Sequence, residues 1–535
     1  RVTSVQNTGL SLISTDANKK MTSLIKRIFY ILVILAVVLF AGRVFVTQRS
    51  APLELWHTFV PQEMSVQQID TADWAQYLKH EAEVMESVRT QVTQKLDART
   101  QTAGNRYFEG SPMHYGHLAH DWNRSFVLQP KTKAIGAVVL LHGLTDSPSS
   151  IQRIAQEYTA QGFAAVGIRL PGHGTVPAGL VKAQWEDWMA ATRLAVREAQ
   201  THIDANMPLH VVGYSNGGAL AMKYALESIE NKQLRKPARV VLMSPMIGVT
   251  RFARFAGLAG IPAYFPAFAQ AAWLGVVPEF NPFKYNSFPV NGARQSYRLS
   301  ESLQEQLVRV AGKDGLAELP PVLTFQSVVD FTVSTSAIVT ALYQNLPANG
   351  SELVLFDVNR SAKFGPLLSP SFYTALDGIL PTGPQDYRLT VVANAATGNN
   401  SIVERSTAPG EGTAAVRPLD QTYPPGIFSL SHIAIPFAMD DPLYGVTPDP
   451  KTQDNYGVNL GTQAPRGERG GIILSMDGLL RVTANPFFPY MLKKMEDTMV
   501  AASAASVANI PAKKYTPAST PAPMNVPQEL LDAAP

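Results

Sequence analysis

Between residues 125 and 360 the chain alternates short apolar runs with longer amphipathic segments. Most of the apolar runs are rich in β-branched residues and apolar on both faces, which is typical of strands in a covered parallel sheet. They read SFVLQP, AIGAVVLLHG, FAAVGIRLPG, PLHVVGYS, ARVVLMSP, PVLTFQSVVD and SELVLFDV. Helices are expected between them at 148–161, 184–203, 216–229 and 334–346. The alternation predicts an α/β fold with a doubly wound, mostly parallel sheet.

Four other stretches depart from this rhythm. Residues 66–98 carry helix formers with apolar positions three or four apart, which predicts a helical stalk or a helix packed on the core. Residues 249–319 begin with a run rich in Phe and Ala, and we expect an insertion that covers one end of the sheet. Residues 361–425 are rich in Pro, Gly, Ser and Thr, with one strand-like run, YRLTVVANA. From about residue 498 the low-complexity composition predicts a tail without stable order.

An uninterrupted apolar run, IFYILVILAVVLFAG, occupies residues 28–42 and continues as VFV after Arg43. Together the two runs reach about the 20 residues that a bilayer-spanning helix needs. Because Lys and Arg residues precede the run, the positive-inside rule places that flank in the cytoplasm and everything after Arg49 across the membrane. The alternative is a cleaved signal peptide, whose apolar region would be shorter and for which LFAG is a poor cleavage site. We therefore favour an uncleaved anchor.

Composition narrows the possible functions. The chain has 535 residues, a net charge of +3 and no cysteine. Its Lys and Arg residues are scattered and do not form the dense basic stripe of a nucleic-acid surface, so we expect no nucleic-acid partner. The lack of cysteine excludes disulfides, thiolate metal sites and a cysteine nucleophile. We expect no cofactor and no metal.

The segment GYSNG at residues 213–217 joins an apolar strand to a helix, with Ser215 at the joint. A sharp strand-to-helix turn brings the two elements close together, so side chains at Gly213 and Gly217 would collide with the neighbouring backbone. The turn lifts the hydroxyl above the carboxyl edge of the sheet, beside the positive end of the helix dipole. This placement predicts a nucleophilic serine. Halide or epoxide chemistry would need a carboxylate at the same position.

A serine hydroxyl needs a histidine base, and the histidine needs an orienting carboxylate. In sheets with such an elbow, the three residues follow the order Ser, Asp or Glu, His. Only His432 follows the serine, so it is the predicted base. Asp330 ends a strand-like run at the same rim and is the preferred acid. Asp357, at the end of the next strand, is the alternative.

The oxyanion hole is expected to use the backbone amides of Asn216, directly after the serine, and of Leu144 in the loop LLHGLTDSPSS. Gly143 lets that backbone turn toward the substrate. We interpret His142 as a structural residue that fixes the loop. His173, in the run RLPGHG, suggests a metal ligand, but no second ligand lies near it at metal spacing, so we interpret it as part of a turn beside the pocket.

These motifs, in this order and spacing, resemble those of the α/β-hydrolase superfamily, and within it the serine esterases and monoacylglycerol-lipase-like enzymes. The resemblance rests on LLHGLTDSP, LPGHG and the serine elbow, and covers about residues 125–360 plus the His432 segment. It implies a cap between the strands that end near Pro245 and Asp330, where the aromatic insertion lies. The chain departs from the family pattern because some 65 residues separate His432 from the last strand of the core.

The pattern and the resemblance together suggest a division of the chain into parts. The expected parts are a leader (1–20), a membrane anchor (21–49), a helical stalk with a lead-in segment (50–124), the first half of the hydrolase core (125–248), a cap insertion (249–319), the second half of the core (320–445) with the insertion 361–425, a C-terminal extension (446–497) that has no counterpart in the common core and would form an added lobe, and the tail (498–535).

The leading hypothesis is a membrane-anchored serine hydrolase that cleaves carboxylic esters through Ser215, His432 and Asp330. Its partners would be a small-molecule acyl ester and, through the N-terminal helix, the inner membrane, with the catalytic domain in the periplasm. One alternative is a peptidase or amidase with the same residues. Another is a non-catalytic envelope protein that uses the fold as a binding scaffold.

Overall fold

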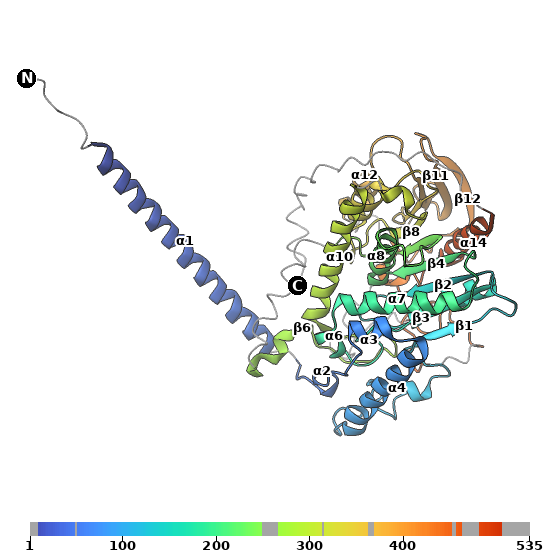
Figure 1. The fold of residues 1–535 in the computed structure, drawn as a ribbon, viewed down its shortest axis with the longest axis horizontal. Helices are drawn as coiled ribbons and strands as arrows, with labels where there is room; N and C mark the ends of the chain where they lie inside the picture. The colour runs from blue at the N-terminus through green and yellow to red at the C-terminus, as the bar shows by residue number, and fades with distance from the viewer. Residues whose placement is uncertain are drawn as a thin grey trace, which may run out of the picture.

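The computed structural model describes residues 9–48, 51–248, 266–312, 315–361, 369–451, 456–462 and 481–504. Across these ranges ten strands form one sheet, in the order β1-β3-β2-β4-β5-β8-β9-β10-β11-β12 (Figure 1). The strands are β1 (Phe126–Leu128), β2 (Gly136–Leu141), β3 (Phe163–Ile168), β4 (Leu209–Tyr214), β5 (Arg239–Met243), β8 (Val322–Ser327), β9 (Glu352–Phe356), β10 (Arg388–Asn394), β11 (Ser401–Thr407) and β12 (Ala415–Thr422). Neighbours from β3 to β10 pair in parallel, whereas β1, β11 and β12 pair antiparallel. The predicted mostly parallel sheet is confirmed.

Helices cover both faces of this sheet. The main ones are α5 (Ser149–Ala160), α7 (Trp185–Thr201), α8 (Asn216–Glu230), α10 (Val290–Ala311) and α14 (Phe488–Ala504). Successive residues of a strand serve opposite faces: in β2, Val139 belongs to the hydrophobic cluster of α7, α8 and α10, and Val138 to that of α5 and α14. The sheet is therefore doubly wound, as predicted.

Three of the four helices expected between the first strands are present as α5, α7 and α8. The segment predicted as a helix at 334–346 differs, because it breaks into a short α11 (Thr335–Ala337), a π turn (Ile338–Leu342) and a 3₁₀ turn (Tyr343–Asn345). Its β-branched residues lose side-chain freedom in a helix, which weakens a regular helix here.

The segment that begins at residue 51 packs on the core. It contains α2 (Leu55–Thr58), α3 (Val66–Thr71) and α4 (Trp74–Gln91), and α3 lies against α7 (Figure 1). Ile69 and Tyr77 are buried in the same cluster as the sheet. Of the two possibilities left open for residues 66–98, the packed helix is therefore correct, and the free stalk is wrong.

Part of the expected cap insertion belongs to the core. Residues 249–265 lie outside the described residues, and 266–289 form a 3₁₀ helix η5 (Pro266–Ala272) and two short paired strands, β6 (Trp273–Gly275) and β7 (Phe288–Pro289). The following helix α10 packs along α8 and α6 (Gly179–Lys182). Its Leu299, Leu303 and Leu307 are buried among residues of the sheet's helices. The sequence predicts a cap over one end of the sheet for all of 249–319, whereas α10 packs on the helices of the core.

Two further differences concern the second half of the chain. The insertion 361–425 contains α12 (Pro370–Ile379) and three strands, whereas the sequence predicted only the first of them, β10. The hairpin β11–β12 was missed because its few apolar residues are mixed with charged and polar ones. It lies at the edge of the sheet, where most of β12 is exposed. The expected boundary at residue 498 divides α14. This helix lies against α5, with Phe488, Met491 and Met495 buried, and so completes one face of the core instead of forming an added lobe.

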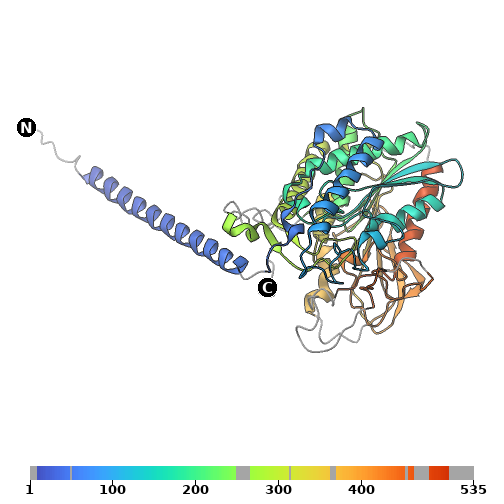
Figure 2. The ribbon, with the colours of Figure 1, turned by 90° about the horizontal axis from the view of Figure 1, so that it is seen from below.

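The N-terminal helix α1 (Gly9–Gln48) projects away from the α/β domain (Figure 2). Its residues Met21–Gly42 have a mean hydropathy of 2.5 and none of that stretch is buried. Among the described helices it is the one that is long and apolar enough to cross a membrane.

We expect Phe487→Ala to lower the free energy of unfolding by about 3–5 kcal/mol, because it removes a fully buried ring. That ring stacks on Phe356 of β9 at 5.4 Å and meets Tyr423 edge-on at 5.0 Å. Denaturant unfolding of the wild type and the variant measures the change in the free energy of unfolding. The control is Phe331→Ala, which removes a ring that is 92% exposed and should change stability by less than about 0.5 kcal/mol. Equal effects would contradict a core role for the start of α14.

Candidate active site

Ser215 occupies the single residue between β4 and α8. Its backbone has φ 55° and ψ −115°, a region that residues with side chains rarely adopt. A Cβ at Gly213 would lie 2.2 Å from the carbonyl oxygen of Gly217, and one at Gly217 would lie 2.1 Å from the carbonyl oxygen of Leu141. Both flanking positions are therefore restricted to glycine by backbone atoms that cannot move aside.

The structure brings Ser215, His432 and Asp330 together. The Ser215 Oγ lies 2.9 Å from Nε2 of His432, and the Nδ1 of the same ring lies 2.9 Å from Oδ2 of Asp330. Ser215 and His432 are each 5% exposed, and the Asp330 side chain is fully buried. The imidazole thus joins a hydroxyl to a carboxylate in a site that is largely shielded from water.

Asp330 is held in position by its own loop. Its second carboxylate oxygen, Oδ1, accepts hydrogen bonds from the amides of Thr332 at 2.8 Å and Val333 at 3.0 Å. Burial alone would raise the pKa of Asp330, but His432 and these two amides hold it below its usual value. The alternative acid, Asp357, instead pairs with Arg360, whose Nη2 lies 3.1 Å from Oδ2.

The long separation between the last core strand and His432 has a structural explanation. The inserted segment leaves the core after β9 and returns beside its starting point. Asn359 binds the returning chain: its backbone amide donates to the Phe428 carbonyl at 2.8 Å, and its side-chain amide donates to the Ile427 carbonyl at 2.8 Å. Ser327, the last residue of β8, then donates to the Leu430 carbonyl at 2.9 Å. These hydrogen bonds position the segment before His432 so that the histidine lies at the rim of the sheet.

The loop at residues 142–145 lies directly against the serine. A Cβ at Gly143 would be 3.3 Å from that of Ser215. Nε2 of His142 accepts a hydrogen bond from the Leu170 amide at 3.1 Å, so the proton resides on Nδ1, which donates to the Gly143 carbonyl at 2.9 Å. That carbonyl and the Leu144 amide belong to one peptide plane, so the ring fixes the direction of the amide. His142 occupies the loop-fixing position expected for it.

The other two predicted positions lie as follows. Asn216 is the first residue of α8, where backbone amides have no partner within the helix. His173 is fully buried, and its Nδ1 lies 3.2 Å from the Pro171 carbonyl. Burial lowers the pKa of His173 to about 4. In the part of the chain that the structure describes, no group of His, Asp and Glu side chains could hold a metal ion.

Sequence reasoning missed two contributors to this region. Tyr285, from the expected cap, donates its amide to the Thr145 carbonyl at 2.7 Å and so lies across the loop beside the serine. The ring of Tyr214 lies beside that of His432, with centroids 5.5 Å apart and the planes tilted by 32°, and its hydroxyl donates to the His432 carbonyl at 3.3 Å. The position of Tyr214 in the elbow was the one available signal for such a role.

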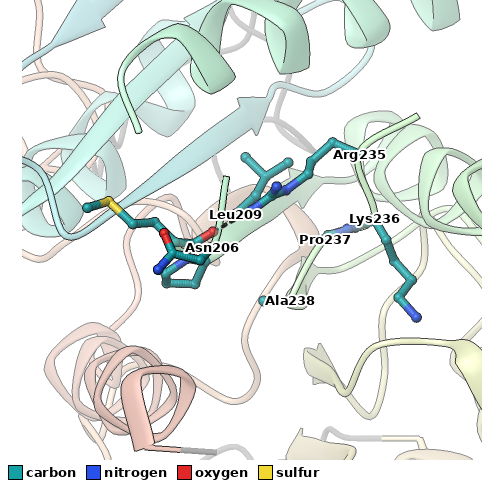
Figure 3. A pocket seen from close by; sticks show the side chains of 8 residues that line it. Asn206, Leu209, Arg235, Lys236, Pro237 and Ala238 are labelled. Atoms are coloured by element: carbon teal, nitrogen blue, oxygen red, sulfur yellow. Dashed lines mark hydrogen bonds between the residues drawn. The ribbon is translucent and has the colours of Figure 1, made fainter. Parts of the chain in front are cut away.

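A hollow elsewhere on the molecule is unrelated to these residues. It is lined by Asn206, Leu209, Arg235, Lys236 and their neighbours (Figure 3). Leu209 begins β4, whereas Ser215 follows the last residue of that strand. The hollow therefore lies at the amino ends of the parallel strands, away from the serine at their carboxyl ends.

Residues 132–357 match the model of the family described as serine aminopeptidase, S33. The matched range contains the strands β2 to β9, the elbow and Asp330. The chain carries an α/β-hydrolase domain. This α/β-hydrolase domain is similar to that of monoacylglycerol lipases: 89 residues are 32% identical to a thermostable monoacylglycerol lipase of Bacillus sp. (strain H-257). That match covers 16% of the present chain and spans about a third, 34%, of the length of the lipase.

Two solved structures match part of this chain at low identity and low TM-score. A chain from the study of LipS and LipT, two metagenome-derived lipolytic enzymes, is 21% identical with a TM-score of 0.35, covering 48% of this chain and 97% of its own. A soluble variant of monoglyceride lipase from Saccharomyces cerevisiae is 15% identical with a TM-score of 0.33, covering 43% and 81%. The packed N-terminal helices, the inserted hairpin β11–β12, His432 and α14 all lie outside the matched family range.

Proposed function

We propose that the protein is a serine hydrolase that cleaves carboxylic esters, with Ser215 as nucleophile, His432 as general base and Asp330 as the carboxylate that orients it. The observation that carries this proposal is the continuous hydrogen-bonded line from the Ser215 hydroxyl through the imidazole to Asp330, with both contacts at 2.9 Å. The alignment matches the geometry that serine hydrolysis requires.

In the proposed reaction, Nε2 of His432 removes the hydroxyl proton as Oγ attacks the acyl carbonyl. Asp330 accepts from Nδ1 and stabilises the imidazolium that forms. The amides of Leu144 and Asn216 bind the tetrahedral oxyanion, which also faces the N-terminal end of α8. His432 then protonates the leaving alcohol. A water molecule, activated by the same imidazole, attacks the acyl-enzyme and frees the carboxylic acid.

Small acyl esters are the proposed substrates. The support is the similarity to a monoacylglycerol lipase, together with the buried surroundings of Ser215. Among the described residues, the site needs no metal or cofactor for this chemistry, because the three side chains and two backbone amides supply each role.

Ser215→Ala and His432→Ala should each lower kcat for a nitrophenyl ester by about 10⁴-fold or more, and Asp330→Asn by about 10⁴-fold. A fluorophosphonate probe should label the wild type and should not label Ser215→Ala. The control is Ser228→Ala, since Ser228 is a buried serine of α8 whose hydroxyl binds only the Ala225 carbonyl of its own helix. An unlabelled wild type would favour a non-catalytic scaffold instead, and undiminished labelling of Ser215→Ala would exclude Ser215 as the nucleophile.

Amide cleavage is a second candidate because the matching family is described as a serine aminopeptidase. The same residues could perform it, with His432 protonating a leaving amine. We expect esters to be preferred: kcat/KM for nitrophenyl esters of rising chain length should exceed that for aminoacyl nitroanilides. The His432→Ala variant is measured on both series, so that background hydrolysis of the more reactive esters is subtracted. Higher kcat/KM for the amides after this correction would overturn the preference.

We further propose that α1 anchors the protein in the inner membrane of a diderm bacterium by a single span, with the catalytic domain in the periplasm. The apolar stretch Met21–Gly42 and the basic residues Lys26 and Arg27 near its start support this orientation. An alkaline phosphatase fusion at the C-terminus should be active and should stay with membranes after carbonate extraction. A fusion after residue 20 is the control for the cytoplasmic side. Cytoplasmic exposure of the C-terminal fusion would refute the topology, and release of the domain would indicate a cleaved signal peptide.

A further inference from the structure

A fully buried arginine lies in the turn RLPGHG, outside the residues that the proposed reaction uses. The Arg169 guanidinium makes a bidentate ion pair with Glu63, with Nη1–Oε1 at 2.7 Å and Nη2–Oε2 at 2.9 Å. A second carboxylate, Glu81, lies 3.7 Å from its Nε. The side chains of Arg169 and Glu81 are 1% and 2% exposed. The Glu63 side chain is 15% exposed. Burying charged groups is costly unless they are well paired, so the cluster demands an explanation.

The two carboxylates hold the backbone of the turn as well as the arginine. Glu63 Oε1 also accepts from the Gly172 amide at 2.8 Å. Arg169 donates from Nη1 to the His173 carbonyl at 3.0 Å, across the same turn. Gly172 has φ +80°, a conformation that the turn needs and that most residues avoid. Glu63 thus fixes both ends of residues 169–173.

Glu81 supports the same turn through one intermediate. Its carboxylate accepts from the amide of Ser125 at 2.9 Å and from the hydroxyl at 2.6 Å, and that hydroxyl accepts from the Arg169 amide at 2.9 Å. Both acids come from the segment that follows the candidate anchor: Glu63 precedes α3, and Glu81 lies in α4. This segment precedes the matched family range.

The turn that Glu63 holds contacts the oxyanion loop through His142, by a hydrogen bond from Leu170 and by the ring of His173, whose centroid lies 5.0 Å from that of His142. Between Arg169 and Gly172, the Leu170 amide donates to Nε2 of His142, and His142 in turn holds the Gly143 carbonyl whose peptide includes the Leu144 amide. A shift of the turn would release Nε2 and allow the ring to change tautomer or rotate. The direction of the Leu144 amide therefore depends on Glu63 through three successive links: Glu63 to the turn, Leu170 to His142, and His142 to Gly143.

The charge states of Glu63 and His142 are those that these hydrogen bonds require. Burial would raise the pKa of Glu63, but Arg169 and the Gly172 amide hold it below its usual value, so Glu63 remains ionised. Burial lowers the pKa of His142 well below its usual value, which keeps the ring neutral with Nε2 free to accept.

We propose that Glu63 is a positioning residue for the oxyanion hole, which acts through Arg169 and the Gly172 amide on the turn that holds His142. The proposal rests on the proposed function, because it concerns the Leu144 amide as an oxyanion donor. Under this proposal, the segment that carries Glu63 both connects the domain to the proposed anchor and positions a group of the active site.

Glu63→Gln tests the proposal, since it keeps the side chain's shape and removes its charge. We expect kcat and kcat/KM for a nitrophenyl ester to fall about tenfold, with KM changed less than twofold, because oxyanion contacts act in the transition state. Loss of a whole oxyanion donor costs about 10²–10³ in kcat, so a misdirected one should cost less. The Ki of a trifluoromethyl ketone, which forms a tetrahedral adduct on serine, should rise by the same factor as kcat/KM falls.

The matched control is Asp70→Asn. Asp70 lies in the same segment and makes the same bidentate contact, with Arg193 of α7 at 2.9 Å through each oxygen. Among the described residues, no hydrogen bond joins that pair to the turn at 169–173. Hydrogen exchange of the full-length chain in detergent micelles supplies a readout independent of activity. In Glu63→Gln, exchange should rise in residues 169–174 and 142–146, and in Asp70→Asn it should not.

Several outcomes would overturn the proposal. One is unchanged kcat and Ki in Glu63→Gln, even with faster exchange of the turn, since the turn would then not orient the amide. Another is an equal loss in Asp70→Asn, or a loss confined to KM, since either would indicate general loosening of the segment. If Glu63→Gln does not fold, Glu63→Asp retains the charge and is judged by the same ratios. A wild type without esterase activity or probe labelling would instead overturn the proposed function.

Discussion

The arrangement of the site depends on one strained residue. Ser215 holds a backbone conformation that costs on the order of 1–3 kcal/mol, and it persists because close contact of β4 and α8 leaves the chain no alternative. Gly213 and Gly217 make that contact possible, and the Ser215 amide is tied to the Met243 carbonyl at 2.9 Å. With the hydroxyl fixed above the sheet's carboxyl edge, the remaining groups have only to be brought to one rim. The parallel sheet does this, because β2, β4 and β8 all end there.

His432 shows how such a rim tolerates large additions. The chain between β9 and His432 adds a helix and three strands, yet Asn359 bonds to residues 427 and 428 and closes the excursion at its base. The added strands extend the existing sheet at its edge, so they bury apolar surface without displacing the core. The return of α14 to the α5 face is a similar case. The distance along the chain therefore says little about the distance in space once the ends of an insertion are tied together.

The sequence predicted the parts that obey local rules. Apolar runs on both faces located the core strands, and the Gly-flanked serine, the position of Asp330 and the single histidine after the elbow indicated the three residues that meet at the rim. It did not predict features that depend on tertiary contact. The hairpin β11–β12 buries only a few apolar residues among charged and polar ones, α14 lies where composition turns toward low complexity, and the 334–346 segment bends into π and 3₁₀ turns. The charges of Glu63, Arg169 and Glu81 gave no sign in the sequence that they would be buried together.

These buried charges also limit what the matched family range can do by itself. Arg169 lies within that range, but both of its carboxylate partners come from residues that precede it. A domain cut to residues 132–357 would keep the arginine and lose both carboxylates that pair with it, together with the segment that covers it. It would also lose α14 and His432. The folded domain of this protein therefore extends beyond the matched family range, and the segment before that range supplies both carboxylate partners of Arg169.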